Sequence, residues 1–443
     1  MANSRQRVVF IGAAGEMCRL AIERFAVGAD DVELALYDIR PELLEPLLTK
    51  LPAGLATAAR LDLYDQEGLR TAIEGAALVV LGAGPYNRTA GPVMEACLAA
   101  KVPYLDFDDD IESTLHALTL NDAAKAAGVP MYIGCGASPG ITNVLAADAA
   151  GELDTVENID VYWVVGDERG SIGRAVLDHM LRVAAGPCMT WEDGGPVMHQ
   201  SWLETRWTDL GGGLGLTLVH ETAHPEPVTL PRKYPDAKNI RCFGGLDPAP
   251  YNGLVRGVGL AVQKGQMPVE EAIDFLESLL TGGMGSLKGW RHGLAGMRDL
   301  VRTGESTRLE LLTFLAKAAA GHAFPFKGGL KVEATGLRGG IPTVIPRRTP
   351  VAGAGTYLFT DMAAATGTAC AAFMVVAMRC TSSRKRRTAS SWPASSTRSA
   401  MSAAPGRPSS RPWRPGKSTS PAAATRLRRS SSMAAKRRGP TST

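Results

Sequence analysis

Short apolar runs alternate with helical patterns over the first third of the chain. Continuous apolar runs are typical of buried parallel strands, and their alternation with helices is typical of βαβ units. The pattern predicts strands at 8–11, 32–37, 56–61, 78–81, 104–106 and 130–133, with helices such as 15–25 and 91–100. The expected fold class is therefore α/β, with a doubly wound parallel sheet over residues 1–138.

The pattern changes after Gly134. Pro139 and Gly140 open a helix, and an alternating strand follows at 156–165. Glycine-rich loops, a helical block at 269–320 and strands at 329–335 and 356–359 predict a second, α+β domain over residues 139–360. Residues 361–378 predict one buried, alanine-rich helix, capped by Asp361 or Thr360.

The charges are unevenly distributed along the chain. Of 48 Lys and Arg residues, 15 lie in 381–443, which has no Asp or Glu, so 33 basic residues face 44 acidic ones in the preceding 380. The net charge of +4 therefore combines an acidic body with a basic tail. A basic nucleic-acid surface on the folded part cannot be inferred from the total.

Residues 381–443 contain one large aliphatic residue, Leu427, apart from methionine, and are otherwise rich in Ser, Arg, Pro, Ala and Thr. Such a segment cannot bury enough apolar surface to offset its conformational entropy, so we expect it to be disordered. Three origins are open: a solvated tail, an arm that binds polyanions non-specifically, or the translation of a shifted reading frame.

The cysteines indicate a reducing, cytoplasmic location. There are seven, without any C-x-x-C pair, a pattern typical of neither a disulfide framework nor a zinc site. No apolar run approaches the ~18 residues of a membrane span, so we expect no membrane association.

The turn after the first apolar run predicts a dinucleotide-binding loop. Gly12 makes a tight turn, and Gly15 permits close approach of a pyrophosphate to the start of a helix. Cys18 stands where a third glycine is usual, a position that mainly sets helix–strand packing. The expected cofactor-binding residues here are Gly12, Ala13, Gly15, Glu16 and Met17.

Asp38 and Arg40 bear on the choice of cofactor. Asp38 ends the second predicted strand, where a carboxylate accepts from a ribose 2′-hydroxyl and repels a 2′-phosphate. Arg40 can pair with that phosphate or stack on adenine. The residues favour NAD slightly and leave NADP open.

Four further segments carry a family resemblance: GPY at 84–86, ACLAAKVPYLD at 96–106, GASPGITN at 136–143 and HPEPVTLP at 224–231. Their order and spacing resemble the saccharopine dehydrogenase-like family, including saccharopine reductase and lysine dehydrogenase, over about residues 8–378. The resemblance implies a Rossmann domain, an inserted catalytic domain, a helix (361–378) that returns to the Rossmann domain, and oxidation or reduction of an amino-acid C–N bond. Cys18 and the tail depart from the family pattern.

Hydride transfer to an imine carbon needs alignment, one proton carrier and few other side chains. Gly82, Gly84 and Pro85 follow the fourth strand, where backbone can approach the cofactor. The candidate catalytic residues are Tyr86 as a proton donor, Asp106, which matches the family's strand-end aspartate, and His224 as a proton carrier; a packing role for Tyr86 is an equal alternative.

The substrate-binding candidates are charged residues near these segments. We expect Asp108 and Glu226 to anchor an amine and Arg232 and Arg241 to hold carboxylates. Surface exposure is the alternative for each. Asp109 and Asp110 are expected to be solvated, with Asp110 or Ser113 capping the next helix.

Residues 220–224 read HETAH, which matches the zinc motif H-E-x-x-H. That motif requires a helix, and here an apolar strand pattern precedes it and Pro225 follows it. In a strand the two imidazoles would be ~13 Å apart. We therefore expect no metal ion.

The sequence thus predicts an NAD(P)-dependent oxidoreductase acting on CH–NH donors, an amino acid or its imine with a keto acid. Alternatives are a polyamine-pathway reductase that condenses an aldehyde with a diamine, and a non-catalytic NAD(P)-binding sensor or scaffold. A homodimer is the expected assembly.

Overall fold

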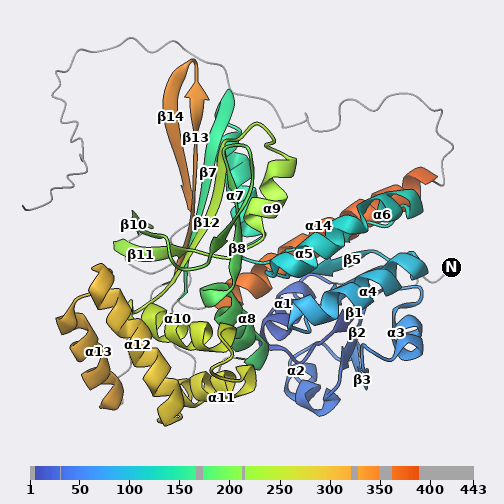
Figure 1. The fold of residues 1–443 in the computed structure, drawn as a ribbon. Helices are drawn as coiled ribbons and strands as arrows, with labels where there is room; N and C mark the ends of the chain where they lie inside the picture. The colour runs from blue at the N-terminus through green and yellow to red at the C-terminus, as the bar shows by residue number, and fades with distance from the viewer. Residues whose placement is uncertain are drawn as a thin grey trace, which may run out of the picture. The chain divides into compact units, whose positions relative to one another are not determined.

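The computed structural model describes residues 5–29, 31–165, 173–211, 215–320, 328–348 and 362–388. A six-stranded parallel sheet forms from the first part of the chain (Figure 1). Its order β3-β2-β1-β4-β5-β6 is that of doubly wound dinucleotide-binding folds. All six predicted strands are confirmed, with ends within two residues of the prediction: β1 (Gln6–Ile11), β2 (Val32–Asp38), β3 (Ala56–Arg60), β4 (Leu78–Leu81), β5 (Tyr104–Asp106) and β6 (Met131–Tyr132).

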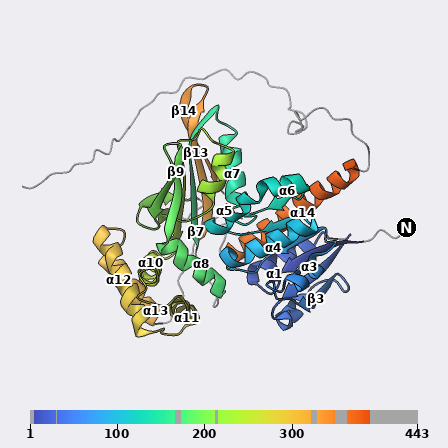
Figure 2. The ribbon, with the colours of Figure 1, turned by 45° about the vertical axis from the view of Figure 1, so that its right-hand side comes forward.

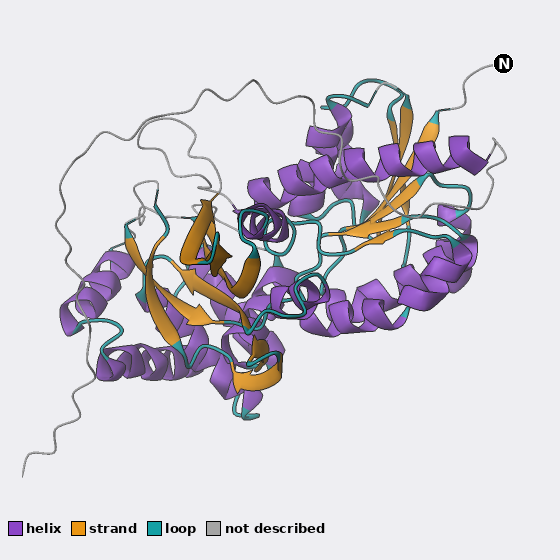
Figure 3. Ribbon diagram, turned by 90° about the horizontal axis from the view of Figure 1, so that it is seen from above, coloured by secondary structure: helices purple, strands orange, loops and turns teal. Residues whose placement is uncertain are grey.

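The connections between these strands are helical. They are α1 (Glu16–Ala26), η1 (Pro41–Leu44), α2 (Glu45–Leu48), α3 (Gln66–Ile73), α4 (Tyr86–Ala100), α5 (Ile111–Thr119) and α6 (Asn121–Ala127). The predicted start of α4 at Gly91 is wrong by five residues, because the helix runs through Gly91 and Pro92. Figure 3 shows helices accompanying each of two groups of strands.

A second, mixed sheet follows in the order β10-β11-β12-β7-β13-β14, with β8 paired to β12 and β9. β7 lies parallel to β12 and antiparallel to β13. The strands are β7 (Thr155–Val165), β8 (Pro187–Glu192), β9 (Gly195–Gln200), β10 (Thr205–Asp209), β11 (Leu216–Glu221), β12 (Asn239–Leu246), β13 (Gly329–Arg338) and β14 (Ile341–Arg348). The strands predicted at 156–165 and 329–335 are confirmed; 356–359 lies outside the described residues.

Helices cover and extend this second sheet. α7 (Ile141–Ala150) packs on β7, β13 and β14, as Figure 2 shows. The predicted helical block at 269–320 is confirmed as three helices that pack with α8 and α10 around a shared apolar core. The remaining elements are α8 (Arg174–Ala185), α9 (Glu226–Thr229), η2 (Leu230–Arg232), α10 (Pro250–Gln263), α11 (Val269–Leu280), α12 (Leu287–Thr303) and α13 (Arg308–Ala319).

The last described helix, α14 (Met362–Thr388), packs against α1 of the first sheet. At Gly367 a Cβ atom would lie 2.7 Å from the Leu20 Cβ and 3.0 Å from the Met17 carbonyl oxygen, so only glycine allows this approach. The predicted helix end at Met378 and tail start at 381 are wrong, because no glycine or proline occurs before Pro393 to stop the helix. The rest of the predicted disordered tail lies outside the described residues.

None of the helices in the described ranges, α14 with its 27 residues included, combines the length and apolar character that crossing a membrane requires.

Candidate active site

The predicted dinucleotide loop forms a tight turn between β1 and α1. Gly12 has a φ of +77°, and its amide and that of Ala13 both donate to the Tyr37 carbonyl, at 2.9 and 3.0 Å. A Cβ at Gly12 would lie 2.5 Å from the Ala83 nitrogen. Gly15 precedes α1 in an extended conformation, so the helix begins directly after the turn, in the arrangement by which a first helical turn binds a pyrophosphate.

Cys18, the departure from the usual third glycine, is accommodated by a glycine across from it. Cys18 is fully buried, and a Cβ at Gly82 would lie 2.6 Å from its Sγ. Burial, and then the charge of Asp38, raise the pKa of the Cys18 thiol above its usual range. The thiol is therefore a packing group, and Gly82 provides the space for it.

Asp38 fixes the end of β2 to the dinucleotide loop. Its Oδ2 accepts from the Ala14 amide and its Oδ1 from the Arg40 amide, both at 3.0 Å. Arg40 itself is exposed beside this carboxylate. Both residues predicted to select the cofactor thus stand at the carboxyl end of β2, next to the turn.

A cavity of about 250 Å³ opens beside the dinucleotide loop. The first sheet's loops contribute Gly15, Glu16, Met17, Gly84, Pro85, Tyr86, Phe107, Asp109 and Asp110, and the second part of the chain contributes Ser138, Trp163, His179, Trp202 and His224 among others. Half of the predicted cofactor residues and two predicted catalytic residues, Tyr86 and His224, therefore border one cavity.

Tyr86 lies at the start of α4 and is buried against Phe107, edge to face, with ring centroids 5.9 Å apart. Its hydroxyl is 3.5 Å from the Leu81 carbonyl oxygen. Burial first, and then Asp106 and Asp108, raise the pKa of Tyr86, so the phenol stays protonated and keeps a hydroxyl that can donate a hydrogen bond.

Asp106 does not border this cavity, which corrects its assignment as a catalytic residue. It is fully buried, and its Oδ1 accepts from the amides of Gly134, at 2.7 Å, and Asp108, at 3.2 Å. Burial raises the pKa of Asp106 to about 6, against the lowering effect of these hydrogen bonds. The carboxylate holds the 134–140 turn in place, and Phe107 occupies the cavity wall instead.

Asp108 is likewise not available to a substrate. It is buried, and it accepts from the Asp110 amide at 2.8 Å and from the Ser113 hydroxyl. Asp108, which was expected to anchor an amine, therefore stabilises the turn that precedes α5.

Asp109 and Asp110, expected to be solvated, are the carboxylates that reach the cavity. Asp110 Oδ1 is 2.9 Å from His179 Nδ1, and both of its oxygens accept from Arg182, at 2.6 and 3.1 Å. Asp109 Oδ2 is 3.3 Å from His179 Nε2. His179 and Arg182 are one turn apart on α8, so one face of this helix meets the acidic loop.

These contacts shift the pKa values of all three titrating groups. Burial alone would lower the pKa of His179, but Asp109 and Asp110 outweigh it and raise that pKa. Burial raises the pKa of Asp109, while His179 partly offsets the effect. Burial also opposes the charge of Asp110, yet its hydrogen bonds with His179 and Arg182 keep its pKa below the usual range.

His224 lies beyond the end of β11 and completes the cluster. One ligand atom each of Asp109, His179 and His224 lies within 4.8 Å of the others. The His224 ring packs near Trp163, at 5.5 Å between centroids, and its Nδ1 is 2.9 Å from Glu226 Oε2.

Glu226 orients His224 and does not anchor a substrate, which corrects its predicted role. It is fully buried, and its Oε1 accepts from the hydroxyls of Ser138, at 2.5 Å, and Thr142, at 2.7 Å. Burial alone would raise the pKa of Glu226, but His224 and the two hydroxyls lower it, so the carboxylate is retained.

The strand interpretation of the HETAH segment is confirmed, because β11 ends at Glu221 and His220 lies within it. His220 is fully buried and stacks on Trp202, with ring centroids 5.1 Å apart. Burial, and then Arg256, lower the pKa of His220 to about 3, so it is a neutral core residue.

The two predicted carboxylate-binding arginines lie elsewhere. Arg241 is paired with Asp160 on the neighbouring strand, at 2.8 Å. It alternates along β12 with Cys242, which lies near His224 and Glu226, so Arg241 faces the opposite side of the sheet.

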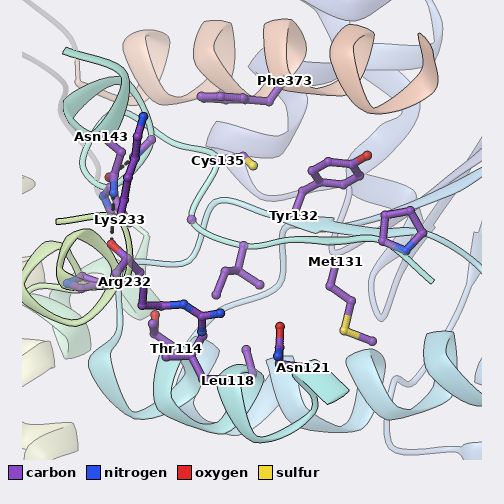
Figure 4. A pocket seen from close by; sticks show the side chains of 18 of the residues that line it. Thr114, Leu118, Asn121, Met131, Tyr132, Cys135, Asn143, Arg232, Lys233 and Phe373 are labelled. Carbon is purple, nitrogen blue, oxygen red and sulfur yellow. Dashed lines mark hydrogen bonds between the residues drawn. The ribbon is translucent and has the colours of Figure 1, made fainter. Parts of the chain in front are cut away.

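Arg232 borders a second cavity of about 1130 Å³ between α5, α6, α7, β6 and α14, on the other side of the 134–140 turn. Figure 4 shows its side chain and that of Lys233 pointing into this space, opposite Phe373 and Tyr132. Arg232 therefore does not meet the cavity beside the dinucleotide loop.

The sequence reasoning missed His179, Arg182 and Trp202. None stands in a recognisable motif; the available signal was a histidine and an arginine on the polar face of an amphipathic helix after a glycine-rich segment.

The sheet order, the glycine turn and the cavity at the carboxyl ends of the strands define a nicotinamide-dinucleotide oxidoreductase fold. Residues 8–131 match the family model described as the saccharopine dehydrogenase NADP binding domain. The resemblance of the sequence to saccharopine dehydrogenase-like proteins is thereby confirmed.

Two similar proteins extend the comparison. The chain is 28% identical over 203 residues to a carboxynorspermidine synthase of Vibrio alginolyticus, which covers 41% of this chain and 47% of that protein. The match thus spans about half the length of this relative. The structure of apo saccharopine dehydrogenase (L-Glu forming) from Saccharomyces cerevisiae superposes with a TM-score of 0.52 at 13% identity, covering 85% of this chain and 92% of that one. At this identity the likeness shows the fold alone.

Proposed function

We propose that the protein is an NAD(P)-dependent oxidoreductase that acts on the C–N bond between an amine or amino acid and a carbonyl compound. One observation carries the proposal: the Asp109–His179–His224 cluster stands in the same cavity as Gly84, Pro85 and Tyr86, next to the dinucleotide loop. A substrate carbon placed over the nicotinamide would have its nitrogen beside these polar groups.

In this proposal, different residues bind the cofactor, exclude water and exchange the proton. The dinucleotide loop binds and orients the cofactor, which supplies or accepts the hydride when bound. Trp163, Trp202 and Phe107 exclude water from the cavity. The cluster stabilises the charge on the substrate nitrogen and exchanges its proton, a contribution of the order of 10²–10⁴ in rate.

The nature of the substrate follows from the charge around the cavity. The charged and titratable groups among the described lining residues are Glu16, Asp109, Asp110, His179 and His224, with no Lys or Arg. Such a wall suits a cationic amine better than a dicarboxylic imine. This favours the condensation of an aldehyde with a diamine over a reaction of the saccharopine type, and the name of the Vibrio relative, a synthase for a carboxylated polyamine, supports it.

The test is reductive amination followed by NADH and NADPH oxidation, with lysine and a keto acid compared against a short diamine and an aldehyde. We expect turnover with the second pair and a loss of about 100-fold in kcat/KM for His179→Asn. His199→Asn, on β9, is the matched control and should retain activity. No turnover with either pair, despite cofactor binding, would favour a sensor or scaffold. The homodimer and the cytoplasmic location stay proposals.

A further inference from the structure

We propose that Asp109, His179 and His224 form a binding site for a divalent transition-metal ion such as Zn²⁺. The site deepens the proposed function, on which it rests only for its place beside the cofactor. Its three side chains come from the loop after β5, from α8 and from the segment after β11.

The spacing of the three groups suits a metal ion. Their ligand atoms all lie within 4.8 Å of one another, and His179 Nε2 is 3.3 Å from Asp109 Oδ2. Zinc bonds of about 2.1 Å in a tetrahedral site separate ligand atoms by roughly 3.4 Å. Side-chain adjustments of about 1 Å or less therefore bring all three onto one ion, and all three residues line the cavity.

The two histidines are oriented as metal ligands usually are. His179 Nδ1 is 2.9 Å from Asp110 Oδ1, and His224 Nδ1 is 2.9 Å from Glu226 Oε2. A ligating imidazole almost always donates its second N–H to a carboxylate or carbonyl group, which fixes its tautomer and raises its basicity. In both rings this arrangement leaves Nε2 as the nitrogen available to an ion.

The local charge also matches a divalent cation. Asp110 is neutralised by Arg182, which contacts both of its oxygens. Asp109 supplies a further carboxylate beside the two imidazoles, and no Lys or Arg is among the described residues that line the cavity. Buried or half-buried charges of one sign require a compensating partner.

Two other groupings of potential ligands are less suitable. His199 is the only histidine of the group that it forms with Glu192 and Glu221, and none of the three borders the cavity beside the dinucleotide loop. The set of His224, Glu226 and Cys242 shares one histidine with the proposed site. There, Glu226 already accepts from Ser138, Thr142 and His224 through both oxygens.

The experiment uses the full chain without a polyhistidine tag, stripped of metal with EDTA and titrated with Co²⁺ and then Zn²⁺. Visible ligand-field absorption of Co²⁺ reports tetrahedral binding, and elemental analysis gives the zinc content. We expect one ion per chain, lost in His179→Ala and Asp109→Asn. Asp110→Asn, which changes the partner of His179 Nδ1 and also removes the charge that faces Arg182, should weaken affinity by about 10- to 100-fold.

The controls are His199→Ala and Cys242→Ser, which should bind as the unaltered chain does. Circular dichroism establishes that each variant is folded, and His179→Gln replaces His179→Ala if that variant is not. The proposal is overturned if the unaltered chain binds Co²⁺ no more tightly than His179→Ala. It is also overturned if Cys242→Ser abolishes binding while His179→Ala retains it.

The same samples separate the metal site from the proposed function. Turnover by metal-free chain that takes up no ion would eliminate the site and leave the function standing. A stoichiometric ion with the expected variant pattern, but no turnover with any amine and carbonyl pair, would establish the site and remove the function.

Discussion

Replacing Asp106 by asparagine should stabilise the protein at alkaline pH. The Asp106 carboxylate is fully buried, and burial outweighs the hydrogen bonds from the Gly134 amide, the Tyr104 hydroxyl and the Asp108 amide that stabilise its charge. Asparagine keeps an oxygen for the Gly134 and Asp108 amides and removes the buried charge. Because Asp106 does not border the cavity, we expect kcat/KM of Asp106→Asn to stay within a few-fold of the unaltered chain.

The magnitude follows from the pKa of this carboxyl. Burial raises it from an ordinary value of 3.8 to about 6. At about 1.4 kcal/mol per pH unit, ionising Asp106 in the folded protein costs roughly 3 kcal/mol. The folded state binds more protons than the unfolded state between these values, so stability falls as pH rises through that range. About half of the difference should develop between pH 5 and pH 8.

The assay is urea unfolding of both proteins at pH 5 and pH 8, followed by circular dichroism, with Asp122→Asn as a control for losing one exposed carboxylate. The advantage of Asp106→Asn should be larger at pH 8 than at pH 5. An equal difference at the two pH values would refute the buried-charge reasoning. A 100-fold loss of kcat/KM in Asp106→Asn would restore the residue to the mechanism.

Three further predictions concern the cofactor site and the acidic loop. Gly12→Val should weaken NADH and NADPH binding at least tenfold in a fluorescence titration, because its Cβ would collide with Ala83 at 2.5 Å; unchanged affinity would remove the turn from the binding site. Arg40→Ala should weaken NADPH binding more than NADH binding in the same titration, and an equal effect on both would place the ribose elsewhere. Arg182→Met leaves buried Asp110 without its arginine and should cost about 2 kcal/mol or more in urea unfolding; a change below ~0.5 kcal/mol would mean that His179 suffices.

The first sheet could be predicted because buried parallel strands are continuous apolar runs bounded by turns. The dinucleotide loop followed for the same reason, since its glycines stand directly between such a run and a helix. The compensation between Cys18 and Gly82 could not be predicted, because it depends on contact between segments more than sixty residues apart in the sequence.

The carboxylates after β5 show where sequence reasoning ended. Side chains alternate between the two faces of a strand only as far as the strand runs. Beyond its end the sequence did not indicate which of the carboxylates from Asp106 to Asp110 would face the cavity. The structure shows the reverse of what was expected: Asp106 and Asp108 are buried away from the cavity, and Asp109 and Asp110 line it. Arg241 was misassigned for a different reason: no strand was predicted at β12, so its alternation with Cys242, which puts Arg241 on the other face of the sheet, could not be used.

In the proposed function, the contact of the acidic loop with α8 joins groups from both sheets into one site. Neither part of the chain holds all of these groups, so a variant that keeps the first sheet and α14 but lacks the second sheet and α8 should bind coenzyme and show no turnover. Conversely, replacing α8 and the elements next to it with those of a relative should change the substrate specificity and leave the affinity for the coenzyme unchanged.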